Sequence, residues 1–224
     1  MQDSMSDARQ YAPATERNKQ VILQILQQVL PDSGTVLEIS SGTGEHAIFF
    51  APHVAPLYWV PSDPNPIARA SIDAWRHSYP CESLCGAIAL DVRDTQWPVE
   101  QPQDSDAFPE ALKQVNLTVS PIRAIVNINM IHISPWNACC GLMAGAGRIL
   151  PSGGILYVYG PFKQGGIHTA SSNASFDQSL RSQNPEWGVR DLEVVIAEAA
   201  KHHLLHYSTI PMPANNLSVV FQKE

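Results

Sequence analysis

A glycine-rich turn follows a short apolar segment, and its residues have the types and spacing of a nucleotide-cofactor cradle. Thr35–Ile39 is predicted to form a buried β-strand, Ser40–Gly44 the turn, and residues 45–51 a helix. Gly42 and Gly44 permit positive φ angles and the close approach of a ligand. The free backbone amides of such a turn and helix start point towards that ligand. We therefore predict that this turn contacts a cofactor.

Three carboxylates stand at or near the ends of successive predicted strands. Glu38 lies four positions before Gly42, Asp63 follows the second strand, and Asp91 ends the third. In an open α/β sheet the ligand lies beyond the carboxyl ends of the strands. A carboxylate at the position of Asp63 accepts hydrogen bonds from two ribose hydroxyls, and Asp91 suits an adenine amino group. These positions strengthen the prediction of a nucleotide cofactor.

Polar side chains also follow the fourth predicted strand, residues 122–128. Asn127 and Asn129 lie at its end, and His132 comes directly after them. A reacting oxygen or nitrogen must lose a proton, and histidine is the side chain best suited to accept one near neutral pH. We predict that His132 is this base. The alternative is a structural hydrogen bond near the helix start at Ser134.

Composition favours a globular protein that binds a small molecule. The chain has 224 residues, of which 44% are hydrophobic and 16% charged, and its net charge is -7. An acidic chain without a run of Lys or Arg is not expected to bind nucleic acid. Residues 1–10 lack the pattern of a secretory signal, and no segment has about 18 uninterrupted apolar residues, so we expect no membrane span and a cytoplasmic location. The cysteine spacing does not indicate a metal site, and the oligomeric state stays open.

Predicted strands and helices alternate along most of the chain, which is typical of a parallel α/β sheet. The expected helices are 15–30, 45–51, 67–78, 136–150 and 191–203, and the expected strands are 35–39, 57–61, 86–91, 122–128, 155–159, 204–210 and 217–222. Residues 211–216 are too few for a helical crossover, so the last two strands should be antiparallel. Residues 160–188 are rich in Gly, Ser, Asn and Pro, and we expect a long functional loop with one helical turn or more around 176–181.

Six segments together carry a family resemblance. They are EISSGTGEH at 38–46, PSDP at 61–64, ALD at 89–91, NINMIHISPW at 127–136, LPSGG at 150–154 and GPF at 160–162. The chain from Arg17 onwards resembles the class I S-adenosylmethionine-dependent methyltransferases, and more closely a small methyltransferase-like family of unknown function. The resemblance implies a Rossmann-like, doubly wound, mostly parallel seven-stranded α/β sheet with an antiparallel C-terminal strand. We expect residues 1–14 to form a polar arm and residues 15–224 a single domain.

The resemblance also implies the cofactor, S-adenosyl-L-methionine, and the product, S-adenosyl-L-homocysteine. Glu38 and Gly42–Gly44 would hold the methionine moiety, Asp63 the ribose, and Asp91 with Val92 the adenine. The full set of expected cofactor contacts is Arg17, Asn18, Glu38, Ser40, Gly42, Thr43, Gly44, Asp63, Asp91, Val92, Asn127 and Asn129.

The expected reaction is methyl transfer to an oxygen or nitrogen of a small molecule, in which positioning carries most of the catalysis. Aromatic and amide side chains in the second half of the chain are candidates for the acceptor pocket, although large aromatic residues also serve as ordinary packing. The expected substrate contacts are His46, Trp136, Phe162, His168, Asn173, Glu186, Trp187 and Asn215, of which His46, His168 and Glu186 are also weaker candidates for the base.

Two other functions fit the same residues. The segment from Gly42 to Ala47 also satisfies a relaxed G-x-G-x-x-A pattern, so an NAD-dependent oxidoreductase is one alternative. A catalytically silent S-adenosylmethionine-binding interaction protein is the other. Glu38 and the antiparallel C-terminal strands favour the methyltransferase.

Overall fold

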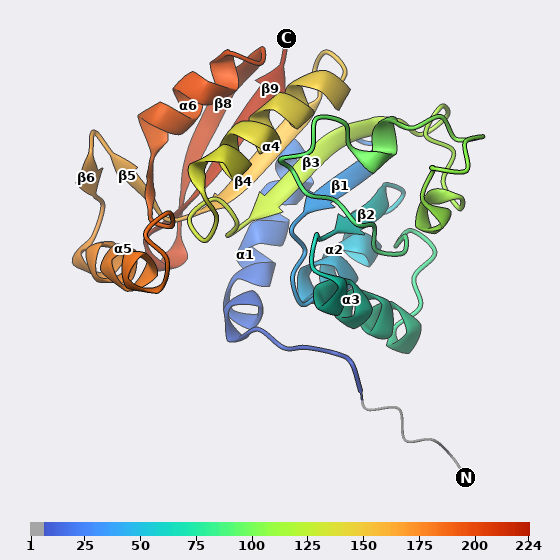
Figure 1. Ribbon diagram of the computed structural model, residues 1–224, viewed down its shortest axis with the longest axis horizontal. Helices are drawn as coiled ribbons and strands as arrows, with labels where there is room; N and C mark the ends of the chain where they lie inside the picture. The colour runs from blue at the N-terminus through green and yellow to red at the C-terminus, as the bar shows by residue number, and fades with distance from the viewer. Residues whose placement is uncertain (1–6) are drawn as a thin grey trace.

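Short apolar, partly β-branched runs form the strands of a central sheet in the computed structural model, which describes residues 7–224 (Figure 1). The main sheet has six strands in the order β2, β1, β3, β4, β9, β8. Their bounds are β1 Thr35–Ile39, β2 Tyr58–Ser62, β3 Ile122–Ile128, β4 Ile155–Gly160, β8 Leu204–Met212 and β9 Asn216–Lys223. β2, β1, β3 and β4 are parallel, and β9 runs antiparallel to both β4 and β8. The predicted α/β class and the antiparallel C-terminal pair are confirmed.

Helices cover both faces of this sheet. The α-helices of the described residues are α1 Pro13–Val29, α2 Glu45–His53, α3 Pro66–Ser78, α4 Trp136–Ile149, α5 Ser171–Gln183 and α6 Leu192–Ala200, of which α5 lies to one side of the sheet. Successive strand residues face opposite sides, so Val36 packs with Ile22 of α1 and Phe50 of α2, whereas Leu37 packs with Leu142 of α4. α4 and α6 therefore cover one face, and α1 and α2 the other, with α3 beside α2. This two-sided burial explains why the parallel strands are apolar along their whole length.

The expected strand at 86–91 is the main difference from the seven-stranded sheet. This segment lies beside β2 but forms only isolated parallel bridges, between Trp59 and Leu84 and between Ser62 and Ile88. Pro61 stands between these bridges, and it accepts a hydrogen bond from the amide of Ile88 but has no amide hydrogen to donate. The ladder is interrupted there, and the main sheet has six strands.

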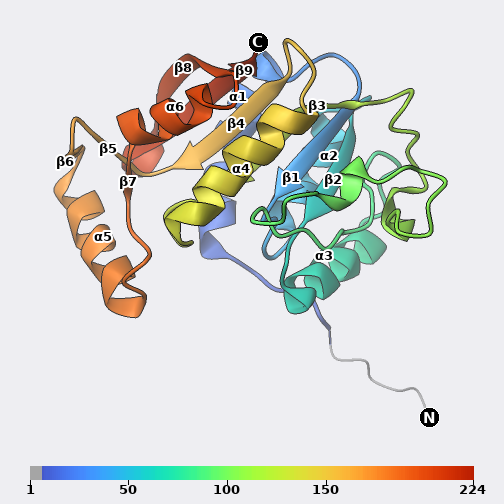
Figure 2. The ribbon, with the colours of Figure 1, turned by 45° about the horizontal axis from the view of Figure 1, so that its top comes forward.

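Residues 160–188 are more ordered than the long loop we expected. They contain β5 Phe162–Gln164, β6 Ile167–His168 and the whole of α5, which has 13 residues. β5 pairs with β6 and with the short strand β7 Arg190–Asp191 in a separate three-stranded sheet. Figure 2 places this unit to one side of the main sheet. The buried positions of α5 include Asn173 and Asp177, so an apolar helical period is missing from its sequence.

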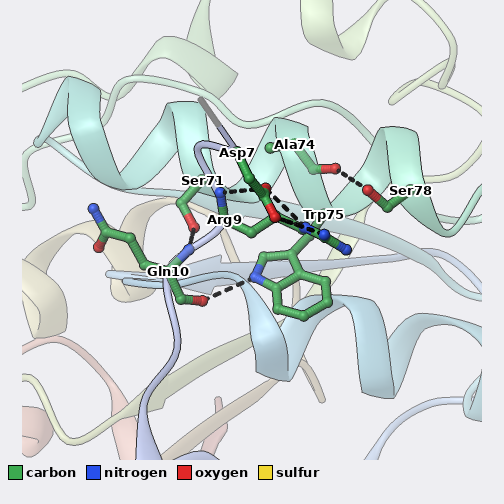
Figure 3. A network of polar contacts seen from close by, with 7 residues as sticks. All are labelled: Asp7, Arg9, Gln10, Ser71, Ala74, Trp75 and Ser78. Carbon is green, nitrogen blue, oxygen red and sulfur yellow. Dashed lines mark hydrogen bonds and ion pairs between the residues drawn. The ribbon is translucent and has the colours of Figure 1, made fainter. Parts of the chain in front are cut away.

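The segment before α1 is fixed to α3 by polar and aromatic contacts (Figure 3). The amide of Gln10 donates to Ser71 Oγ at 2.8 Å, and the Trp75 indole donates to the Gln10 carbonyl at 3.0 Å. The rings of Tyr11 and Trp75 meet edge to face at a centroid distance of 5.0 Å. Residues 1–6 of the expected polar arm lie outside the described residues. Within residues 7–224 no helix is long and apolar enough to cross a membrane.

Candidate functional site

A cavity of about 560 Å³ opens at the carboxyl edge of the parallel strands, where the sequence places the cofactor. We refer to it as the first cavity. It is lined by Ala12, Ala14, Thr15, Ser40, Ser41, Gly42, Thr43, His46, Asp63, Pro64, Leu90, Asp91, Val92, Arg93, Ile128, Asn129, Met130, Ile133, Ser134, Pro135, Ala138 and Trp187. Seven of the expected cofactor residues are among them: Ser40, Gly42, Thr43, Asp63, Asp91, Val92 and Asn129. The structure thus brings together residues that follow β1, β2, β3 and the 86–91 segment beside β2.

The turn after β1 leaves open space in front of Gly42. Gly42 has a φ of +57°, and a Cβ added to it would meet nothing within 4 Å. Its amide donates to Asp63 Oδ2 at 3.1 Å, and Asp63 Oδ1 accepts from the amide of Asn65 at 2.8 Å. Asp63 is 7% exposed. The turn and the carboxylate therefore form a preformed polar corner with room for a ligand against the glycine backbone.

Gly44 has a different role from the one we expected. A Cβ at this position would lie 2.8 Å from the Ile72 Cα in α3. Gly44 does not line the cavity, and its φ of +89° begins α2 in a left-handed conformation. Its missing side chain therefore lets α3 pack closely against the turn.

Glu38 lies beneath the turn and does not line either cavity described here. It is 1% exposed, and its Oε2 accepts a hydrogen bond from the Trp59 indole at 3.0 Å. Burial raises the pKa of Glu38 to about 7, which the hydrogen bond from Trp59 partly opposes. Its position indicates a role in supporting the turn from below.

We expect Glu38→Gln to change how stability depends on pH. The pKa of Glu38 is raised from 4.5, so the folded protein holds this proton more tightly than the unfolded chain. The stability of the parent should fall by about 2–3 kcal/mol as pH rises from 4.5 through 7. Glu38→Gln should lack this fall while keeping an acceptor for Trp59. Urea unfolding at pH 5 and pH 8 measures it, with the exposed Glu82→Gln as control. Equal pH slopes in parent and Glu38→Gln would contradict the prediction.

Asp91 and Val92 form a further wall of the first cavity, together with Arg93. The Arg93 guanidinium pairs with Asp91 at 2.5 Å, and this hydrogen bond lowers the pKa of Asp91. Val92 is 5% exposed and belongs to the core on the α4 face. In this wall, core packing therefore fixes Val92, and the ion pair with Arg93 holds Asp91 in place.

A second cavity, of about 740 Å³, adjoins the first, and Ala14, Asn129 and Ile133 line both. It is lined by the ends of β3 and β4, one face of α1, the start of α5 and the turn between β8 and β9. The residues are Ala14, Arg17, Asn18, Val21, Asn129, His132, Ile133, Tyr159, Pro161, Ser172, Asn173, Phe176, Pro213, Ala214, Asn215 and Asn216. Arg17 and Asn18, which we expected at the cofactor, line this second cavity. Asn173 and Asn215, which we expected at the acceptor, also line it.

His132 is a buried wall residue of the second cavity. It is 3% exposed, its ring meets that of Phe176 at 5.6 Å, and Gly160 lies close to it because a Cβ there would be 3.1 Å from Nδ1. Nδ1 is buried without a hydrogen-bond partner in residues 7–224, so Nε2 is the ring nitrogen available to a molecule in the cavity. Burial, and to a smaller extent Arg190, lower the pKa of His132 to about 4. The imidazole is therefore neutral at physiological pH.

His46 lines the first cavity, whereas we expected it at the acceptor. Its Nε2 lies 2.8 Å from Asn18 Oδ1, and its ring stacks on Phe50. Burial lowers the pKa of His46 to about 4, with a smaller contribution from Lys19. The pair of His46 and Asn18 thus joins α2 to α1 at the boundary between the two cavities.

Five other expected site residues lie away from both cavities. Asn127 is fully buried and donates to the Ile39 carbonyl at 3.1 Å, joining β3 to β1. Phe162 is core, and Trp136 packs against the same core beneath Arg190. His168 Nε2 lies 3.4 Å from Asp177 in the unit around α5, and the backbone carbonyl of Glu186 accepts from Arg190. Trp187, expected at the acceptor, lines the first cavity.

Backbone geometry marks the same two cavities. Within residues 7–224 five residues other than glycine have positive φ, namely Ser40, Asn129, His203, Ala214 and Asn215. All except His203 line one of the cavities. Such conformations cost energy and persist where the surrounding structure holds them, often at functional sites. The residue types at Ser40 and Ala214 give no sign of this conformation, because Ser and Ala rarely adopt a positive φ. Asn129 and Asn215 are of a type that adopts it more readily.

Sequence reasoning selected Arg17 and Asn18 of α1 but missed the other residues that α1 and the segment before it contribute. Ala12, Ala14 and Thr15 line the first cavity, and Ala14 and Val21 the second. The available signal was the period of α1, in which positions 14, 17, 18 and 21 share one helical face. The wall residues Tyr159 and Pro161 could have been found as the end of the fourth parallel strand.

The family described as "Protein of unknown function (DUF938)" matches residues 9–223 of this sequence. The chain belongs to this family. The match covers nearly the whole described chain, including both cavities, so the DUF938 family shares the segments from which the site is built.

Several solved structures similar to this DUF938 protein are methyltransferases, and three of them are described here. An O-methyltransferase family protein from Burkholderia thailandensis matches with a TM-score of 0.72 and 11% identity, over 94% of this chain and 57% of that one. Human N-acetylserotonin methyltransferase in complex with S-adenosylmethionine matches with 0.71 and 11%, over 94% and 52%. An O-methyltransferase family 2 protein from Planctomyces limnophilus in complex with apigenin matches with 0.66 and 17%, over 92% and 62%. The chain spans about half to three-fifths of their length, and the shared property is the class I methyltransferase fold.

Proposed function

We propose that this protein is an S-adenosylmethionine-dependent methyltransferase that acts on an oxygen or nitrogen of a small molecule. The observation that carries the proposal is the pairing of two adjoining cavities, one at the Gly42 turn with Asp63 and one with a neutral histidine. The similar folds of methyltransferases support it, and none of the structures compared above favours an oxidoreductase.

The first cavity fits an adenosyl cofactor. The space in front of Gly42 admits a ligand against the backbone, and Asp63 supplies a carboxylate for ribose hydroxyls. Asp91 and Val92 would face the adenine, and Ser40, Thr43 and Asn129 the remainder of the cofactor. When bound, S-adenosylmethionine supplies a methyl group whose S–CH₃ bond breaks with the electron pair left on sulfur.

Within this proposal His132 accepts the proton of the acceptor. Methyl transfer to a neutral hydroxyl gives a protonated ether. This species is far more acidic than an imidazolium with a pKa of about 4, so transfer of its proton to His132 Nε2 is favourable. An alkylated amine binds its proton too tightly for such a weak base. The histidine therefore favours an oxygen acceptor, and the two walls position the reacting groups.

Calorimetry with S-adenosylhomocysteine and with NAD tests the proposal. We expect S-adenosylhomocysteine to bind and NAD to give no signal. Binding of NAD alone would overturn the assignment in favour of an oxidoreductase. Cofactor binding without any methylated product across a broad metabolite extract would instead identify a binding protein that lacks transfer.

We expect Asp63→Asn to weaken binding of S-adenosylhomocysteine by about 10- to 100-fold. The change removes a charge-assisted acceptor for ribose hydroxyls, which contributes about 1.5–3 kcal/mol. The near-isosteric amide keeps the volume of the carboxylate, but its single oxygen can accept from only one of the Gly42 and Asn65 amides, so part of the loss comes from the turn itself. The control is Asp32→Asn, an exposed position before β1. An affinity within twofold of the parent in a folded Asp63→Asn protein would remove the main support for an adenosyl cofactor.

The division into an arm of residues 1–14 and one domain of residues 15–224 stays our proposal, as does a cytoplasmic location. The contacts of Gln10 and Tyr11 with α3 support a docked position for the described part of the arm.

A further inference from the structure

The charged side chains around the two cavities differ in sign. Among residues 7–224, Arg17 is the one charged side chain that lines the second cavity, and no Asp or Glu of this range lines it. The first cavity has Asp63, Asp91 and Arg93, and Arg93 is already paired with Asp91. The first cavity therefore has an excess of negative charge, and the second has an excess of positive charge.

Arg17 is free to bind a ligand. It is exposed, and it forms no ion pair with any carboxylate in residues 7–224. Its neighbour Lys19, by contrast, pairs with Glu16. Arg17 shares a face of α1 with Ala14, Asn18 and Val21, and this face borders the cavity. A guanidinium in this position offers a planar pair of donors that matches a carboxylate.

Amide side chains complete the second cavity. Asn173 Nδ2 donates to the Asn215 carbonyl at 2.9 Å, and Asn215 Nδ2 donates to Ser172 Oγ at 3.1 Å. These bonds tie the β8–β9 turn to α5 and hold the wall in place. Tyr159 also lines this cavity, and burial raises the pKa of its hydroxyl, so it stays a neutral donor. The wall therefore combines neutral polar groups with apolar side chains, and Arg17 is the charged residue among its lining residues in the described chain.

From this arrangement we infer that the second cavity binds a small hydroxylated carboxylate, with the carboxylate on Arg17 and the hydroxyl directed to His132. This inference rests on the proposed function, because it names the chemical class of the acceptor for that reaction. The amides of the wall would bind further polar groups, and Val21, Pro161 and Phe176 provide apolar surface for the carbon skeleton of the molecule.

Matched acids and amides provide the test, with protein saturated in S-adenosylhomocysteine. The pairs are lactate and lactamide, malate and malamide, and para-hydroxybenzoate and para-hydroxybenzamide, each measured by calorimetry and by thermal shift. In the parent we expect at least one acid to bind about tenfold more tightly than its amide, and added KCl to weaken only the acid. Arg17→Gln should reduce the acid's advantage to below about threefold without changing the amide. Arg17→Lys should restore part of it, and Lys19→Gln is the control.

Several results would overturn the inference while leaving the proposed function intact. One is that no acid binds to a protein that binds S-adenosylhomocysteine, and another is that the amides bind as tightly as the acids. A third is a tenfold loss of S-adenosylhomocysteine affinity in Arg17→Gln, which would assign Arg17 to the carboxylate of the cofactor. Failure of the parent to bind S-adenosylhomocysteine at all would instead count against the proposed function.

Discussion

Replacing His132 by glutamine should lower kcat by about 10²- to 10⁴-fold, the usual contribution of a positioned proton acceptor. The glutamine amide reaches the region of Nε2 and preserves much of the buried volume, but it does not take up a proton. S-adenosylhomocysteine affinity should stay within about twofold, because His132 lines the second cavity and not the first. The measurements are steady-state kinetics with the acceptor and calorimetry with S-adenosylhomocysteine.

The pH profile separates this role from a structural one. His132 has a pKa of about 4 and is neutral above that value, so the parent rate should stay level from about pH 8 to pH 5. Its protonation should reduce the rate only near pH 4, and this decline should be absent from the residual activity of His132→Gln. His206→Gln, an exposed histidine on β8, is the matched control. A loss of less than threefold in kcat with unchanged cofactor binding would show that the imidazole only fills space.

Replacing Gly145 by alanine should destabilise the protein by about 3 kcal/mol or more. Gly145 lies in α4, and an added Cβ would be 1.9 Å from the Trp97 Cζ2. Trp97 is fully buried, and its indole fills the space that the glycine leaves. Overpacking at a site without room commonly costs 1–3 kcal/mol and occasionally more, and here the overlap is with a rigid ring. Urea unfolding gives the change in the free energy of unfolding.

Two further variants make the Gly145 prediction decisive. Asn137→Ala is exposed on the same helix and should stay within about 0.5 kcal/mol of the parent. Trp97→Leu opens space beside Gly145, so the double variant should lose less stability than the sum of the single variants. Additive losses would show that Trp97 does not limit the size of residue 145. The Trp97 indole donates to the Val92 carbonyl, and Val92 and Asp91 line the first cavity. Gly145→Ala should therefore also weaken cofactor binding.

The sequence predicts those parts of the fold and site that depend on chain order and strand ends. Asp63 and Asp91 reach one cavity because parallel strands end at the same edge of the sheet. The Gly42 turn was predictable from its glycines, whereas the role of Gly44 was not, because only the position of Ile72 shows why a side chain is excluded.

The remainder depends on tertiary contacts that leave little local pattern. The sequence analysis predicted helix around 176–181 but not the full length of α5, because this helix buries Asn173 and Asp177 in place of apolar residues. Arg17 and Asn18 were expected at the cofactor, and they line the second cavity, a placement that depends on how α1 packs on the sheet and not on any local pattern. Trp136 and Phe162 show the opposite case, since aromatic residues near the site serve the core.

Ala14, Asn129 and Ile133 form a common boundary for the two cavities. Occupants of both spaces therefore touch the same three side chains, and any adjustment that one occupant imposes on them is felt by the other. Thermodynamic reciprocity requires that each occupant then alters the affinity of its neighbour by the same factor. This factor is measured by titrating the occupant of one cavity at increasing saturation of the other cavity. A factor different from one shows that the three shared side chains couple the two cavities.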